Sequence, residues 1–213
     1  MPSMTSLPKP IRILCVDDHP LMREGIGAYI RSTQDMELVS EAVNGREAIE
    51  QFRQLQPDVT LMDLRLPDIS GVEALTAIRK EFNQARIIVL TTFEGDVDIR
   101  RALEAGARAY LLKTMPRTEL LEAVRKVHAG KRYVPTEVAA QLAQHVGSDL
   151  LSKREIEVLE KIAEGNRNVD IAAMLFISEE TVKGHVKHIM EKLGAADRTE
   201  AVAIGHRRGI IQL

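Results

Sequence analysis

Five residues with side chains suited to phosphoryl chemistry follow short apolar runs. They are Asp17 and Asp18 after IRILCV, Asp63 after DVTLM, Thr91 after RIIVL, and Lys113 after ARAYLL. If each run is a strand of one parallel sheet, the carboxyl ends open on a single edge, where ligands bind. Three carboxylates so close together repel one another unless a cation shares the site. The set suits a divalent metal, an acid that accepts a phosphoryl group, and a hydroxyl and an ammonium that bind phosphate oxygens.

Each of these residues alone also has an ordinary structural interpretation. Asp18 stands before His19-Pro20, a sequence typical of a helix start, and Asp63 is compatible with an acidic turn. Lys113 is compatible with a solvated strand end, and Thr91 with a β-branched strand residue. Their joint occurrence, in this order along alternating strand and helix patterns, is what indicates a site.

The first 130 residues alternate short apolar runs with segments of helical periodicity. Asn44 is expected to cap one helix, and Ser70 with Glu73 forms a capping box for the next. Apolar strands that alternate with helices predict a doubly wound parallel α/β sheet. The expected strands are 11–16, 38–43, 58–62, 86–90 and 107–112, and the expected helices are 20–32, 45–55, 70–79, 96–105 and 116–128.

From about Ile11 to Ala129 the sequence resembles the receiver domain of bacterial two-component response regulators. The resemblance implies a five-stranded, flavodoxin-like sheet with strand order 2-1-3-4-5. It also implies that Asp63 accepts a phosphoryl group from a sensor histidine kinase, or by Mg²⁺-dependent self-phosphorylation from a phosphodonor. Lys113 and Thr91 are then expected to contact phosphate oxygens.

The resemblance also implies a Mg²⁺ site that offsets the repulsion between the acid and the incoming phosphate. The expected ligands are Asp18, Asp63, the backbone carbonyl of Arg65, and Asp17 acting through water.

A switch is expected behind the phosphorylated acid. In receivers the Thr hydroxyl, here Thr91, moves toward the phosphate while an aromatic on the fifth strand turns inward. Tyr110 has that position, although a Tyr packed in the core with its hydroxyl at the surface is the alternative. Many receivers have a cis-proline after the Lys, whereas this chain has Thr114, which leaves the Lys113–Thr114 peptide open as cis or trans.

The remainder is expected to be a linker and a small all-α domain of four helices. Residues 1–9 are a disordered lead-in, 10–130 the receiver, 131–149 a linker, and 150–213 the second domain; the Ala- and Gln-rich stretch 136–145 is compatible with a short linker helix. The segment LSKREIEVLEKIAEGNRNVDIAAMLFISEETVKGHVKHIMEKLGAADRTEAV is similar to the LuxR-type helix-turn-helix of NarL/FixJ response regulators. This resemblance implies binding to double-stranded promoter DNA.

The longest helix of that segment has two distinct faces. Val182, Val186, Ile189 and Leu193 recur at core spacing. The resemblance implies that another face, with Lys183, Gly184, Lys187 and His188, enters the major groove, where Lys donates to guanine. Gly184 suits close approach of the backbone to DNA, or is merely tolerated. The expected phosphate contacts are Ser178, Thr181, Arg167 and Asn168.

Composition sets limits on partners and compartment. The chain has 213 residues and a formal net charge of −2, and from Leu150 onward it has ten Lys or Arg and ten Asp or Glu. The general basic footprint of a DNA-binding domain is therefore absent. DNA affinity is expected to come from a local face and from a homodimer formed on activation. The resemblance to the NarL/FixJ regulators implies that this dimer forms through the last helix, around Val202, Ile204 and Ile210.

One cysteine, Cys15, excludes a disulfide within the chain and fits a reducing compartment. No run approaches ~18 apolar residues, so no membrane partner is expected and the predicted location is cytoplasmic.

Three functions remain to be compared. The favoured one is a phosphorylation-controlled transcriptional regulator that is not a dedicated enzyme. A phosphatase of the haloacid-dehalogenase type also phosphorylates an Asp after a strand, but needs a second Asp two residues later, where this chain has Arg65. A phosphorylation-independent binding protein would retain the acidic pocket only as structure.

Overall fold

The computed structural model describes residues 9–92, 95–144 and 151–211. Within these ranges, no helix combines the length and the apolar character that crossing a membrane requires. The contacts divide the chain into two compact units. The first comprises residues up to Thr92 and Arg101–Val138, and the second comprises the segment that ends at Arg100 and the residues from Ala139 on.

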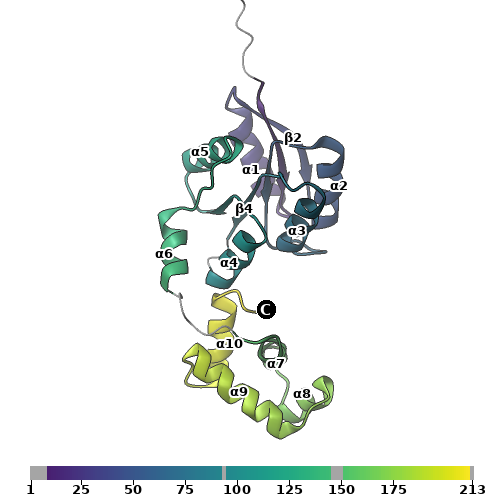
Figure 1. Cartoon of the computed structure of the whole chain (residues 1–213), viewed down its shortest axis with the longest axis vertical. Helices are drawn as coiled ribbons and strands as arrows, with labels where there is room; N and C mark the ends of the chain where they lie inside the picture. Colours follow the sequence, from purple (N-terminus) through teal and green to yellow (C-terminus); the bar gives the residue numbers. More distant parts are fainter. Residues whose placement is uncertain (1–8, 93–94, 145–150, 212–213) are drawn as a thin grey trace, which may run out of the picture. The chain divides into compact units, whose positions relative to one another are not determined.

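The first unit contains a parallel five-stranded sheet (Figure 1). Its strands are β1 (Ile11–Val16), β2 (Met36–Ala42), β3 (Val59–Met62), β4 (Ile87–Thr91) and β5 (Ala109–Leu112). Their spatial order is β2-β1-β3-β4-β5, which confirms the predicted topology. β5 begins two residues later than predicted because its pairing with β4 starts at Ala109, opposite Ile88.

Four helices lie in this unit with the sheet: α1 (Pro20–Arg31), α2 (Gly45–Leu55), α3 (Gly71–Glu81) and α5 (Arg117–His128). The division between the units falls inside α4 (Asp96–Glu104), after Arg100. The predicted caps are confirmed: Asn44 accepts a hydrogen bond from the Glu47 amide, and Ser70 and Glu73 make both bonds of a capping box. Pro116 precedes α5 as its N-cap instead of lying in its first turn, because its ψ of 144° is extended.

The sheet is buried on both faces, as expected for a doubly wound fold. On one face, Ile13, Leu61 and Leu111 pack with Ile26 of α1 and Val124 of α5 in one core cluster. The helices α2 and α3 lie together on the other side of the sheet from α5 (Figure 1). This two-sided burial fixes the strand ends, and therefore fixes the residues that follow them.

The second unit is helical, as predicted. After α6 (Thr136–Gln144), its helices are α7 (Lys153–Ala163), α8 (Asn168–Leu175), α9 (Glu179–Leu193) and α10 (Arg198–Arg207). Val182 and Ile189 of α9 are buried in its core, with Val186 and Leu193 packed beside them, so the predicted stripe is confirmed.

The structure tests the expected linker helix and domain limits only in part. α6 lies in the stretch where a short helix was expected, while residues 1–8 and 145–150 lie outside the described residues. The two compact units divide near Val138, inside the expected linker 131–149. The limits of the receiver, linker and second domain stay predictions.

Candidate functional site

The parallel pairing brings the predicted site residues to one edge of the sheet. The Asp63 amide donates to the Val16 carbonyl at 2.9 Å, which places the end of β3 beside the end of β1. The Lys113 amide donates to the Thr91 carbonyl at 2.8 Å, which does the same for β5 and β4. The residues that follow these four strands therefore meet at one edge of the sheet, as the sequence predicted.

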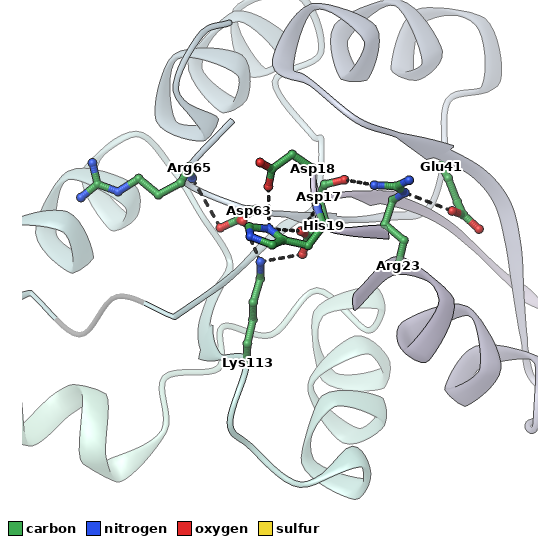
Figure 2. A network of polar contacts seen from close by, with 8 residues as sticks. All are labelled: Asp17, Asp18, His19, Arg23, Glu41, Asp63, Arg65 and Lys113. Carbon is green, nitrogen blue, oxygen red and sulfur yellow. Dashed lines mark hydrogen bonds and ion pairs between the residues drawn. The ribbon is translucent and has the colours of Figure 1, made fainter. Parts of the chain in front are cut away.

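The centre of the site is a buried cation shared by two acids. Lys113 Nζ lies 2.6 Å from Asp17 Oδ2 and 2.7 Å from Asp63 Oδ2 (Figure 2). The three side chains are only 5%, 2% and 4% exposed, respectively. The ammonium thus offsets carboxylate repulsion that water cannot screen at this depth.

Burial and the shared cation act on proton affinity in opposite directions. Burial raises the pKa of Asp63 above its ordinary value, and the hydrogen bond from Lys113 only partly counteracts this. For Lys113, burial acts to lower the pKa, but the hydrogen bonds to Asp17 and Asp63 outweigh it and the pKa is raised. Lys113 is therefore a permanent positive charge beside Asp63.

Four possible metal ligands lie close together, and two of them are the acids paired with Lys113. Asp18 is partly exposed, and its Oδ1 lies 2.7 Å from Nδ1 of His19. Asp17, Asp18, His19 and Asp63 each offer a ligand atom, and these atoms all lie within 4.8 Å of one another. Carboxylate oxygens are the ligands that hard divalent cations prefer, so the donor set fits the predicted Mg²⁺.

Arg65, Thr91 and Tyr110 are the other residues predicted for this site. The Arg65 amide lies 3.4 Å from Asp63 Oδ1, and its side chain extends away from the acids (Figure 2). The side chains of Thr91 and Tyr110 are completely buried. The alternative of a Tyr hydroxyl at the surface is therefore wrong. The Lys113–Thr114 peptide, left open by the sequence, is trans.

Two residues that sequence reasoning missed also support the site. Arg23 of α1 donates from Nη1 to the Asp17 carbonyl at 2.6 Å, and its Nε lies 3.3 Å from Glu41 Oε2 (Figure 2). An Arg in the first turn of the helix that follows the acid pair was a usable local signal. The sequence has no such local signal for Glu41, because this residue comes from the neighbouring strand β2.

The face of α9 predicted to contact DNA is exposed. Lys183 is 54% and Lys187 72% exposed, and Thr181 and His188 are also exposed, whereas Gly184 is half-buried. Lys183 Nζ lies 3.2 Å from Glu179, and Lys187 Nζ lies 3.8 Å from Glu191. Exposed pairs of this kind contribute about 0–1 kcal/mol, so both lysines can exchange partners.

Gly184 has no packing role that the structure reveals. A Cβ built at this position meets no atom within 4 Å. Nothing in the described part of the chain therefore requires glycine there, although glycine in a helix interior costs about 1 kcal/mol relative to alanine.

The predicted phosphate contacts lie at two helix starts. Ser178 caps α9 by accepting from the Thr181 amide at 3.0 Å, and the two hydroxyl oxygens lie 2.8 Å apart. Arg167 is the exposed N-cap of α8 and makes no capping side-chain bond. Within the described part of the chain, Oδ1 of the adjacent Asn168 is buried without a hydrogen-bond partner, but as an acceptor it does not bind an anion. The exposed guanidinium of Arg167 is the group at this helix start that can donate to a phosphate.

Comparison with known proteins covers both units. The family model described as the response regulator receiver domain matches residues 13–125, and the model described as bacterial regulatory proteins, luxR family, matches residues 149–204. The chain is 38% identical over 207 residues to the response regulator protein VraR of Staphylococcus epidermidis, a match that covers 95% of this chain and 99% of that protein. VraR of Staphylococcus aureus is 39% identical with the same coverage.

Two solved structures match nearly the whole chain. The response regulator ChrA of a heme-sensing two-component system is 36% identical with a TM-score of 0.59, covering 96% of this chain and all of that one. RcsB from Salmonella enterica serovar Typhimurium, bound to promoter P1flhDC in the presence of the phosphomimetic BeF3-, is 26% identical with a TM-score of 0.72, covering 92% of this chain and 98% of that one. The chain therefore belongs to the two-component response regulators that combine a receiver domain with a LuxR-type DNA-binding domain.

Proposed function

We propose that a sensor histidine kinase phosphorylates this response regulator on Asp63, and that the phosphorylated form binds promoter DNA as a homodimer. The observation that carries the proposal is the position of Lys113 Nζ, 2.7 Å from Asp63 Oδ2 and 2.6 Å from Asp17 Oδ2. A buried acid held by one cation and flanked by two more acids is suited to accept an anion when a second cation is bound.

The chain's own residues account for the transfer. A carboxylate oxygen of Asp63 forms a bond to phosphorus as the bond from phosphorus to the histidine nitrogen of the kinase breaks, and the electron pair of that bond stays on nitrogen. Asp17, Asp18, Asp63 and the Arg65 carbonyl would hold Mg²⁺, which when bound supplies positive charge against the phosphoryl oxygens. Lys113 needs no proton transfer, because it is already an ammonium.

Transmission to the surface starts at two buried side chains. A phosphoryl group on Asp63 would add oxygen acceptors beyond the carboxylate, and the Thr91 hydroxyl would donate to one of them. Thr91 and Tyr110 lie on adjacent strands and are both fully buried, which supports a coupled rearrangement of the two. The bistable element would be the surface of α4, β5 and α5.

DNA binding is assigned to the exposed face of α9. Lys183, Lys187 and His188 would reach base edges, with Gly184 permitting close approach, while Ser178, Thr181, Arg167 and Asn168 would contact phosphates. The second domain has no general excess of basic residues, so a dimer on two half-sites would supply the affinity that one copy lacks. A regulator that binds promoter DNA in this way acts in the cytoplasm.

The proposed dimer surface is narrower than the sequence indicated. Ile210 is buried in the core of its own unit, so it is not available to a partner chain. Val202 and Ile204 of α10 are only half-buried and remain the proposed contacts.

The test is the intact mass after incubation with acetyl phosphate, with and without Mg²⁺. We expect one Mg²⁺-dependent phosphoryl adduct on the wild-type chain and none on Asp63→Asn. Asp68→Asn is the matched control, because this acid lies in the same unit but away from the site. Its carboxylate accepts hydrogen bonds from the backbone amides of Gly45 and Arg46. An adduct that persists on folded Asp63→Asn would contradict the assignment.

A further inference from the structure

We propose that His19 is a metal ligand of the acidic pocket. Because of this nitrogen ligand, the pocket prefers first-row transition ions such as Ni²⁺, Co²⁺ or Zn²⁺ over Mg²⁺. The preference is stronger than in a pocket whose side-chain ligands are carboxylates alone. This rests on the proposed function only because the metal lies beside the proposed phosphoacceptor. It adds a nitrogen donor to a ligand set that otherwise consists of oxygen atoms.

The spacing of the donor atoms fits one ion. Nδ1 of His19 lies 2.7 Å from Asp18 Oδ1 and 3.2 Å from Asp17 Oδ1. Adjacent ligands of an octahedral ion with bonds of about 2.1 Å are about 3 Å apart. With Asp63 included, the four ligand atoms stay within 4.8 Å of one another. The imidazole nitrogen therefore belongs to the same small volume as the carboxylates.

Lys113 and His19 contact different oxygen atoms of the acids. Lys113 contacts Oδ2 of Asp17 and Oδ2 of Asp63. His19 contacts the Oδ1 atoms of Asp17 and Asp18. An ion bound among the Oδ1 atoms and the imidazole would thus leave the ammonium of Lys113 in place, and both positive charges would remain beside Asp63.

The placement of the imidazole is not explained by helix capping. His19 is the N-cap of α1 but makes no capping side-chain bond, although its backbone amide donates to Asp17 Oδ1 at 2.9 Å. That bond fixes the backbone next to the carboxylate, while the side chain is 69% exposed and open to an ion from solvent. The ring is therefore held near the acids and is also accessible.

Ligand chemistry gives the expected selectivity. Mg²⁺ prefers oxygen ligands and keeps several waters, so it gains little from an imidazole. Nickel, zinc and iron suit imidazole, and affinity rises along the first row toward copper. Loss of His19 should therefore weaken the binding of Ni²⁺ much more than the binding of Mg²⁺.

The experiment is calorimetric titration of the intact, tag-free chain with Ni²⁺ and with Mg²⁺, including Ni²⁺ titrations in the presence of Mg²⁺. We expect competition between the ions on the wild-type chain. His19→Ala and His19→Asn should weaken Ni²⁺ about ten-fold or more and Mg²⁺ by about two-fold at most. The Asn variant keeps a favourable helix N-cap, so a loss in both variants is not a folding effect.

Two controls separate the possible failures. His128→Ala, in the last turn of α5, should leave both affinities unchanged, and Asp18→Asn should weaken both ions. Equal effects of His19→Ala on the two ions, no effect on either, or Ni²⁺ binding that Mg²⁺ does not displace would overturn the role of His19 while leaving the Mg²⁺ site intact. Absence of Mg²⁺ binding to the wild-type chain would instead overturn the metal-dependent part of the proposed function together with this inference.

Discussion

Asp63 Oδ2 lies 2.7 Å from Lys113 Nζ, although fifty residues separate the two along the chain. The contact joins the ends of β3 and β5, two strands that β4 separates in the sheet. The same ammonium also holds Asp17, from the end of β1. One lysine thus ties three strand ends together, so it has both a chemical and a structural role.

Replacement of Lys113 by Met should measure its structural role. Removing one partner of a buried ion pair leaves the acids uncompensated, which costs about 3 kcal/mol of unfolding free energy at neutral pH. The loss should shrink as the pH falls and the acids become protonated. Urea unfolding at pH 7 and at pH 4 measures both effects, and a loss of equal size at the two pH values would contradict this account of the triad.

Arg23 should act on the site through the Asp17 carbonyl. We expect Arg23→Gln to raise several-fold the Mg²⁺ concentration needed for half-maximal phosphorylation of Asp63, with partial recovery in Arg23→Lys, which keeps one donor. The matched control is Arg79→Gln, because Arg79 Nη1 donates to the Ala85 carbonyl at 3.0 Å in the same unit. If both Gln variants change the Mg²⁺ requirement equally, Arg23 has only a general structural role.

Much of this site could be predicted because its information is local. Strand ends follow from apolar runs, and the caps at Asn44 and Ser70 follow from residue types at fixed spacing. The pairing of Arg23 with Glu41 could not be predicted, since it depends on the register between α1 and β2. Ile210 was assigned to a dimer surface, but it is a core residue. Periodicity shows that a position is apolar but not which surface covers it.

Glu155 should make the stability of the second unit depend on pH. Burial alone would raise its pKa, but hydrogen bonds from Lys192 and Ser152 hold it at about 2, against an ordinary value of 4.5. A depressed carboxyl pKa contributes stability above pH 4.5, and this is lost as the pH falls toward 2.

Comparison of Glu155→Gln with the wild-type chain measures this contribution. The variant should be less stable by about 2 kcal/mol at pH 7, less than the full shift implies because Lys192 is partly exposed. The difference should vanish near pH 2. Urea unfolding of the intact chain, followed by circular dichroism, checks it. A deficit that stays constant with pH would mean that lost packing, and not the charge of Glu155, is responsible.

Gly184→Ala distinguishes close approach to DNA from tolerance of glycine. The added methyl group meets open space in the free chain, so the variant should be more stable by up to about 1 kcal/mol. If the backbone of α9 approaches a base edge at this point, the same methyl should weaken promoter binding at least several-fold. Unfolding free energy and DNA affinity are measured on one preparation, and unchanged affinity would favour tolerance.

Lys187 should contribute to DNA binding through its charge, which the weak pair with Glu191 leaves available. We expect Lys187→Ala to weaken promoter binding and, if the ammonium neutralises a phosphate, to reduce the slope of log affinity against log salt by up to about one. Glu191→Gln should strengthen binding, because it frees the same ammonium and removes a negative charge near DNA. Lys161→Ala is the control, since Lys161 of α7 also pairs with a glutamate: its Nζ lies 2.7 Å from Glu164, the C-cap of that helix. Equal changes in Lys161→Ala and Lys187→Ala would indicate general electrostatic attraction, whereas a change confined to Lys187 places the DNA-binding face on α9.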